Sequence, residues 1–392
     1  MQAKDNFSVA LIKAELFKQG GLEKYTWQIA HDFCQRGCEV TILTSGKVQA
    51  PFFHPKLKII TFPINHILSF LNVVHFDKAC CEYLSKFPSS IIFSLDRNRF
   101  QTHLRAGNGV HAAYLQHRKR EEGFVKRLSF AINPLHNTIL SLEKKGFEHS
   151  DLKILFTNSF MVKQEILKFY QIDPSKIQVV HNGVEWHAMQ EDFDQWTIQK
   201  EKVVQALKLD ASAFQFLFIG HNFKRKGLEK LLAALACIKE EQFQLSVVGK
   251  DKNLSYFKAL ASRLGLSKKI FFHGPQNPVI PFYQIADCLV VPSLYDPFAN
   301  VTVEALAMGL FTISSKYNGG SEILTEQNGA VVEALEDPIS FSQILRQALN
   351  QHKTTKRASD IRQTVKHLDF SNQLRAITES TIHSVINTKR RK

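Results

Sequence analysis

Two carboxylates and two cations are the residues of this chain whose types and spacing indicate chemistry. Asp296 and Glu304 are separated by seven residues, and Arg225 and Lys226 stand side by side after an apolar segment. An ionised carboxylate only accepts hydrogen bonds, so this pair suits the hydroxyl groups of a sugar, whereas arginine and lysine suit phosphate. The pattern predicts a nucleotide-sugar site, although a capping aspartate and a solvated helix glutamate would give the same spacing.

A strand, a loop and a helix are expected to position these carboxylates within residues 288–309. Pro292 and Pro297 bracket the loop because proline cannot join a sheet ladder, and Asn300 is a favoured residue for capping the helix that follows. The backbone amides of Asn300 and Val301 would then face the carboxyl edge of a parallel sheet. Uncovered amides at a helix start form an anion site suited to phosphate.

The segment 292–322 resembles the donor-binding signature of retaining GT-B glycosyltransferases of family 4, in which two glutamates are separated by seven residues. Asp296 takes the first of these positions and Glu304 the second. Residues 305–309 and 319–322 stand where this family has small residues and a second glycine-rich turn. Within the family, the chain most resembles the lipopolysaccharide-core glucosyltransferases over nearly its whole length. It departs from them in carrying aspartate at the first position.

The resemblance implies an α/β fold of the GT-B type, with two facing Rossmann-like doubly wound domains and a cleft between them. It implies transfer of a hexose from a nucleotide diphosphate sugar, expected to be a UDP-sugar, to an acceptor hydroxyl with retention. Arg225 and Lys226 would neutralise the leaving diphosphate, Glu304 would hold the ribose, and Asp296 would bind the sugar hydroxyls. Neither a metal ion nor a separate cofactor would be required, because two cations and a helix end supply the charge.

The first half of the chain offers four further site residues. Gly20 and Gly21 open a helix, where backbone amides can approach an anion, and the resemblance places this turn against the donor diphosphate; a plain tight turn is the alternative. Asp96 ends a predicted strand on the same carboxyl edge, and His111 follows a Gly-Asn-Gly loop; together with Asp296 they are the expected catalytic residues. The resemblance implies that His111 faces the transferred sugar. Because the turn is not G-x-G-x-x-G, a nicotinamide cofactor is disfavoured.

The alternation of apolar runs and helical periodicities predicts two parallel, doubly wound sheets. We expect an acceptor-side domain at 1–184, a linker at 185–213, a donor-binding domain at 214–368, and a helix at 369–392 that crosses back to the first domain. The expected strands are 7–12, 40–43, 57–62, 90–94, 152–158 and 177–180 in the first half, and 216–219, 245–248, 270–273 and 289–291 in the second. The linker contains an Asp-x-Asp sequence at 192–194, which is expected not to bind metal there.

Charge and composition restrict the partners. Fifty lysines and arginines against 36 acidic residues leave a formal net charge of +14, which favours polyanionic partners such as nucleic acid, anionic lipid or a phosphorylated acceptor, with simple solubility as the alternative. The expected acceptor is a glycolipid or phosphorylated saccharide, and nucleic acid is not an expected partner. The six cysteines have no C-x-x-C spacing, which is typical of reduced thiols in a cytoplasmic protein. We expect a monomer.

Residues 116–146 interleave basic and apolar side chains at helical spacing. This pattern indicates either a membrane-surface helix or a solvated face that packs on the core. With no apolar run long enough to span a bilayer, contact with the inner face of the cytoplasmic membrane would be peripheral. Two rival functions stay open: a nucleotide-sugar epimerase of the same fold, and a non-catalytic basic protein that binds anionic membrane or nucleic acid.

Overall fold

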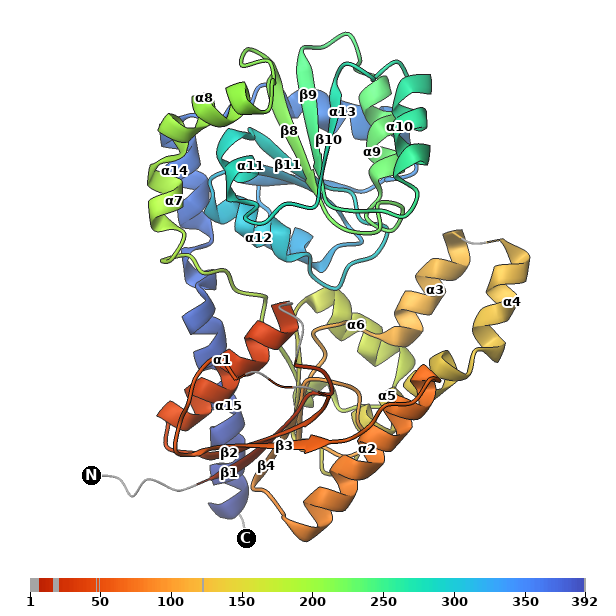
Figure 1. Ribbon diagram of the computed structural model, residues 1–392, viewed down its shortest axis with the longest axis vertical. Coiled ribbons are helices and arrows are strands. Elements are labelled where there is room, and N and C mark those ends of the chain that lie inside the picture. The colour runs from red at the N-terminus through yellow and green to blue at the C-terminus, as the bar shows by residue number, and fades with distance from the viewer. Residues whose placement is uncertain (1–6, 17–20, 47, 49, 122, 391–392) are drawn as a thin grey trace. The chain divides into compact units, whose positions relative to one another are not determined.

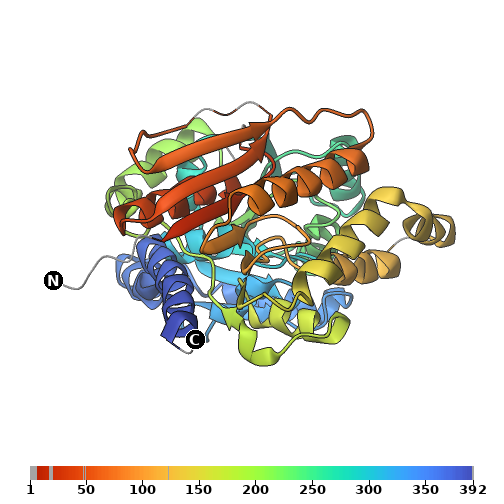
Figure 2. The same ribbon diagram turned by 90° about the horizontal axis from the view of Figure 1, so that it is seen from below.

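A computed structural model describes residues 7–16, 21–46, 48, 50–121 and 123–390. The chain divides into two compact units (Figures 1 and 2). Unit 1 comprises Met1–Val180 and Gln373–Lys392, and unit 2 comprises His181–Asn372. Each unit is a parallel sheet with helices on both faces, as the alternating pattern predicts. Among the described residues, no helix combines the length and the apolar character needed to span a bilayer.

Unit 1 contains a seven-stranded sheet in the order β3-β2-β1-β4-β5-β6-β7. Its strands are β1 (Ser8–Ile12), β2 (Glu39–Ser45), β3 (Leu57–Phe62), β4 (Ile91–Ser94), β5 (His103–Arg105), β6 (Ile154–Thr157) and β7 (Ile177–Val179). Its helices are α1 (Gly21–Gln35), α2 (Ser69–Lys86), α3 (His111–Glu121), α4 (Phe124–Ile132), α5 (Pro134–Phe147), α6 (Phe160–Phe169) and most of α15 (Phe370–Arg390).

The order of the strands fixes where the helices of unit 1 lie. The chain first moves outward from β1 to β3 and then returns to place β4 beside β1. Right-handed crossovers therefore put α1 on one face and α2 and α5 on the other. α15 joins the α1 face, where Thr378 donates a hydrogen bond of 2.6 Å to Asp32. The switch point between β1 and β4 is where ligands bind in sheets of this kind.

Unit 2 contains a six-stranded parallel sheet in the order β10-β9-β8-β11-β12-β13. Its strands are β8 (Phe214–Ile219), β9 (Phe243–Val248), β10 (Ile270–Gly274), β11 (Cys288–Val291), β12 (Phe311–Ser315) and β13 (Gly329–Val332). Its helices are α7 (Gln190–Asp194), α8 (Trp196–Ala206), α9 (Leu228–Ala236), α10 (Leu254–Arg263), α11 (Ile280–Ile285), α12 (Asn300–Ala307), α13 (Pro338–Ala348) and α14 (Thr355–Thr364).

The same reversal occurs in unit 2, where β11 returns to the side of β8. α9, α10 and α13 cover one face of this sheet, and α8, α11, α12 and α14 cover the other (Figure 1). β8 is a continuous apolar run apart from Gln215, and Phe214, Phe216 and Phe218 are at most 2% exposed. Each such side chain contributes about 1.5–3 kcal/mol by leaving water, so β8 anchors the centre of the sheet.

Several sequence predictions need correction. The region 185–213 is not a simple linker, because it folds into α7 and α8, and α8 packs on α11 of unit 2. The basic region 116–146 forms three helices and not one. Strands β5, β12 and β13 were not predicted. β5 carries the buried polar residues His103 and Arg105, so its sequence does not show the apolar run that predicts a buried strand.

Candidate functional site

The loops that follow β8 and β11 meet at the switch point of unit 2. The amide of Leu294, after β11, donates a 3.0 Å hydrogen bond to the carbonyl of Arg225, after β8. Gly227 makes this approach possible: its φ is +77°, and a Cβ atom there would lie 1.7 Å from the carbonyl oxygen of Pro292. Glycine is therefore required, and the two loops hold their side chains in one place.

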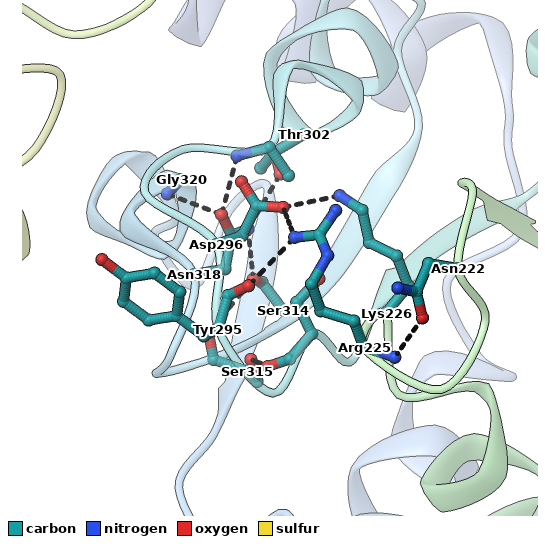
Figure 3. Close-up of polar contacts among 12 residues, drawn as sticks. Asn222, Arg225, Lys226, Tyr295, Asp296, Thr302, Ser314, Ser315, Asn318 and Gly320 are labelled. Carbon is teal, nitrogen blue, oxygen red and sulfur yellow. Dashed lines mark hydrogen bonds and ion pairs between the residues drawn. The ribbon is translucent and has the colours of Figure 1, made fainter. Parts of the chain in front are cut away.

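Arg225, Lys226 and Asp296 form one ionic cluster at this edge (Figure 3). The Asp296 Oδ2 atom lies 2.6 Å from Lys226 Nζ and 3.3 Å from Arg225 Nη1. Arg225 Nη1 also donates to the carbonyl of Tyr295 at 3.2 Å. Asp296 is 8% exposed, so its charge needs this pairing. Two cations against one carboxylate leave a surplus positive charge at the cluster.

Asn318 ties the surrounding segments together. Its side chain is fully buried. The Oδ1 atom accepts from the amides of Ala299 and Gly320, and the Nδ2 atom donates to Thr302 and Ser314, all within 3.1 Å (Figure 3). One amide side chain thus satisfies four partners from the loop before α12, the helix itself, β12 and the glycine-rich turn.

The amino end of α12 differs in detail from the sequence prediction. Asn300 is the first helical residue and not the cap, which is Ala299, and no side chain caps this helix. The Asn300 Oδ1 atom instead accepts a 2.7 Å hydrogen bond from Asn182. The amide of Thr302 bonds to the carbonyl of Ala299. Within the described part of the chain, the amides of Asn300 and Val301 have no hydrogen-bond partner, so they can receive an anion.

Glu304 lies one turn further along α12 and is half-buried. Its Oε2 atom accepts a 2.8 Å hydrogen bond from the hydroxyl of Tyr283 on α11. Burial raises the pKa of Tyr283 well above its usual value, and the adjacent Glu304 charge adds to the effect. Tyr283 therefore remains a donor, and Glu304 is held as an acceptor.

Asp96 in unit 1 is engaged by its own unit. Its carboxylate lies 3.0 Å from Lys13 Nζ and accepts a 2.7 Å hydrogen bond from the amide of Ala14. Lys13 and Ala14 follow β1, and Asp96 follows β4, so this pair occupies the switch point of unit 1. The structure gives the carboxylate a positioning contact with the loop after β1.

His111 is the first residue of α3, and its backbone is hydrogen-bonded to Glu143 on α5. The backbone amide of His111 donates to both carboxylate oxygens of Glu143, at 2.7 and 3.0 Å. Glu143 is 1% exposed and also accepts from Arg97 Nε at 2.6 Å and from the Tyr170 hydroxyl at 2.7 Å. The imidazole Nε2 atom of His111 lies 3.0 Å from His136 Nδ1.

The ionisation of His111 follows from this environment. Burial lowers its pKa to about 4, and the charges of Arg97 and His136 act in the same direction. The imidazole is therefore neutral near pH 7, and it can donate or accept a hydrogen bond but does not carry a positive charge.

The glycine turn at 20–21 and the Asp-x-Asp sequence at 192–194 are the remaining predicted positions. Gly20 lies outside the described residues, and Gly21 is the first residue of α1. Asp192 and Asp194 lie on α7 and not at a strand end. In the described ranges, no group of three or more histidine, cysteine, aspartate or glutamate side chains could hold a metal ion.

The structure thus brings Arg225, Lys226 and Asp296 into contact in unit 2 and places the open end of α12 on the same edge of the sheet. Asp96 and His111 belong to unit 1. Sequence reasoning missed three buried polar residues: Asn318, Tyr283 and Glu143. Only Asn318 had a usable signal, because an asparagine before two glycines marks a turn.

Comparisons with known proteins agree with this architecture. The family model for "Glycosyltransferase Family 4" matches residues 19–186, and that for "Glycosyl transferases group 1" matches residues 199–365. The chain is 23% identical over 348 residues to lipopolysaccharide glucosyltransferase WaaG of Escherichia coli K12, which is 88% of this chain and 90% of that protein.

Two further similarities point the same way. The chain is 28% identical over 153 residues to the lipopolysaccharide core biosynthesis glycosyltransferase LpsD of Rhizobium meliloti, covering 39% of this chain and 44% of that protein. The crystal structure of a WaaG, described as a glycosyltransferase involved in lipopolysaccharide biosynthesis, superposes with a TM-score of 0.75 at 21% identity. That match covers 95% of this chain and 99% of the other.

Proposed function

Because this chain belongs to the GT-B glycosyltransferases of family 4, related to lipopolysaccharide-core glucosyltransferases, we propose that it transfers a hexose from a UDP-sugar to a cell-envelope glycolipid. The acceptor group would be a hydroxyl of a lipopolysaccharide core, and the anomeric configuration would be retained. The observation that carries the proposal is the cluster of Arg225, Lys226 and Asp296 beside the open end of α12 (Figure 3).

The diphosphate of the donor would bind to this cluster. Arg225 and Lys226 would exchange Asp296 for phosphate oxygens, and the amides of Asn300 and Val301 would donate to the same group. Asp296, released from its cations, could then accept hydrogen bonds from sugar hydroxyls. Positive charge held in place before the reaction stabilises the negative charge that develops on the leaving diphosphate, without a metal ion.

The ribose and the transferred sugar would use other groups. Glu304 would accept hydrogen bonds from the ribose hydroxyls, because a carboxylate held by Tyr283 cannot act as a donor. In unit 1, we propose that neutral His111 faces the transferred sugar, and that Asp96 holds the loop after β1 that leads to Gly20 and Gly21. The acceptor would bind to unit 1.

Peripheral contact with an anionic membrane fits the same acceptor. On α4, Leu128 is 60% exposed and Ile132 is 76% exposed, and the four-residue spacing puts them on one face of the helix. Arg127 adds a cation beside them. Such a face can enter the headgroup region of a bilayer and bring unit 1 to a glycolipid.

Thermal-shift screening against UDP-, GDP- and ADP-sugars tests the donor site. A ligand at 100 times its dissociation constant should stabilise the fold by about 2.7 kcal/mol, and so raise Tm by several degrees. Transfer to isolated lipopolysaccharide core, with the product linkage read by NMR, tests the acceptor and retention. If no sugar nucleotide shifts Tm, the proposal is wrong. If one binds but is only isomerised, the protein is an epimerase.

A further inference from the structure

Tyr283 contacts Glu304 and is not one of the groups that we propose to contact the donor. We infer that Tyr283 is a positioning residue that fixes the Glu304 carboxylate for reading the ribose hydroxyls of the donor. The inference rests on the proposed function, and it adds the residue on which ribose specificity depends. Its basis is the 2.8 Å hydrogen bond from the Tyr283 hydroxyl to Glu304 Oε2.

Tyr283 is itself held firmly, independently of Glu304. Its side chain is 2% exposed, and its backbone carbonyl accepts a 3.0 Å hydrogen bond from Lys353 Nζ. Lys353 is buried, its ammonium nitrogen lies 4.6 Å from the centre of the Trp196 ring, and its amide donates to Asp287 at 3.1 Å. A hydroxyl carried on so fixed a residue can define the direction of a flexible partner.

Glu304 needs such a partner because a glutamate side chain has three rotatable bonds and is only half-buried here. Ordering a free glutamate during binding would cost affinity, and a carboxylate ordered beforehand avoids that cost. Because burial keeps Tyr283 protonated, the hydroxyl donates to Glu304 throughout the working pH range. The pair therefore presents a fixed acceptor, and hydroxyl groups of a ribose match an acceptor.

The test compares UDP with 2′,3′-dideoxy-UDP by calorimetry on the wild-type chain and on Tyr283→Phe. Phenylalanine keeps the ring packing and removes only the hydroxyl. We expect UDP to bind about 3- to 10-fold more weakly to the variant, because the Glu304 carboxylate loses the hydrogen bond that fixes its Oε2 atom. Binding of the dideoxy analogue should hardly change, since it has no hydroxyls for Glu304 to read. The preference for UDP over the analogue should therefore fall by the same factor.

Two variants make the result specific. Glu304→Gln should lower the same preference, and adding Tyr283→Phe to it should lower the preference no further, as expected when two residues act as a unit. Tyr256→Phe is the matched control, because the Tyr256 hydroxyl donates to Glu229 at 3.1 Å on the exposed surface. Tyr256→Phe should leave the affinities for UDP and for the dideoxy analogue unchanged.

The outcomes separate this inference from the proposed function. If the wild-type chain binds neither UDP nor GDP, measured by the same calorimetry, the proposed donor site is wrong and the role of Tyr283 is wrong with it. If the wild-type chain prefers the ribose nucleotide but Tyr283→Phe keeps that preference, or weakens both ligands equally, only the positioning role is overturned. A purely structural tyrosine would produce the latter result.

Discussion

The switch points of the two sheets carry the same pair of residues in different surroundings. In unit 1, Lys13 after β1 lies 3.0 Å from Asp96 after β4; in unit 2, Lys226 after β8 lies 2.6 Å from Asp296 after β11. Each pair joins the two strands at which the chain reverses direction. The topology thus places a cation and a carboxylate at equivalent positions, and the neighbours decide what each pair can do.

The neighbours balance the charge in unit 1 and leave an excess in unit 2. Asp96 also accepts the amide of Ala14, and from β4 the chain runs to β5 without an intervening helix. Asp296 instead has a second cation in Arg225, and the helix that follows β11 opens toward the same edge. A balanced pair holds a loop in place, whereas a pair with surplus positive charge can exchange its carboxylate for a phosphate.

The comparison is tested most strongly by removing the cation in unit 2. Lys226→Ala should lower the rate of transfer by about 10²–10³-fold, because one fixed positive group is lost where charge develops. Steady-state kinetics with a UDP-sugar would measure this. Lys224→Ala, which removes an exposed cation two residues earlier, is the matched control and should leave the rate nearly unchanged.

Lys13→Ala supplies the counterpart in unit 1. It should lower the free energy of unfolding and weaken the binding of UDP much less than Lys226→Ala does, since its pair supports a loop and carries no surplus positive charge. If Lys13→Ala weakened the binding of UDP as much as Lys226→Ala does, the distinction between the two switch points would be wrong.

The next largest effect concerns the buried support of unit 1. Glu143→Gln should lower the free energy of unfolding by about 2 kcal/mol, because an amide cannot accept from all of Arg97, Tyr170 and the His111 amide. Urea denaturation would measure it. Glu148→Gln, which alters a more exposed carboxylate in the same region, should change stability by less than about 0.5 kcal/mol. An equal loss in both variants would contradict the role of Glu143.

Local patterns predicted the parts of the fold that local physics determines. The buried strands of a parallel sheet are largely continuous apolar runs, so β1, β8 and β11 were visible in the sequence. Arg225, Lys226 and Asp296 could be assigned to one edge because they follow strands of one parallel sheet. The GT-B architecture follows from this alternation together with the resemblance.

Tertiary contacts determine the rest, and the sequence does not display them. Asn300 was expected to cap α12, but the amide of Ala299 is bound by Asn318, so the start of the helix is set from β12 and its turn. Tyr283 meets Glu304, and Glu143 meets His111, from other helices. A rule that reads only neighbouring residues cannot find such partners.

A smaller effect sharpens the charge argument in unit 2. Asp296→Asn should tighten binding of UDP by about 3- to 10-fold, which corresponds to about 1 kcal/mol, because the carboxylate no longer competes with phosphate for Lys226 and Arg225. The rate of transfer from the UDP-sugar should fall. Calorimetry with UDP and kinetics with the sugar nucleotide would measure the two changes. Weaker binding of UDP would show that Asp296 orders the cations and does not compete with phosphate.

The last test concerns how well His111 is shielded from water in unit 1, and it uses the pH dependence of stability. The folded pKa of His111 is about 4, below its ordinary value of 6.5, so between these values the unfolded chain binds a proton that the folded chain does not. Stability should fall as pH falls through this window, by at most about 1.4 kcal/mol per pH unit for one proton. His111→Gln should show a shallower slope in urea denaturation from pH 4.5 to 7.5. Above pH 6.5 the difference between the two proteins should be constant, since His111 is neutral in both states there. If the free energy of unfolding depended on pH in the same way for the wild-type chain and His111→Gln, the imidazole would be open to water. The site in unit 1 would then be as exposed to solvent as the ionic cluster of unit 2.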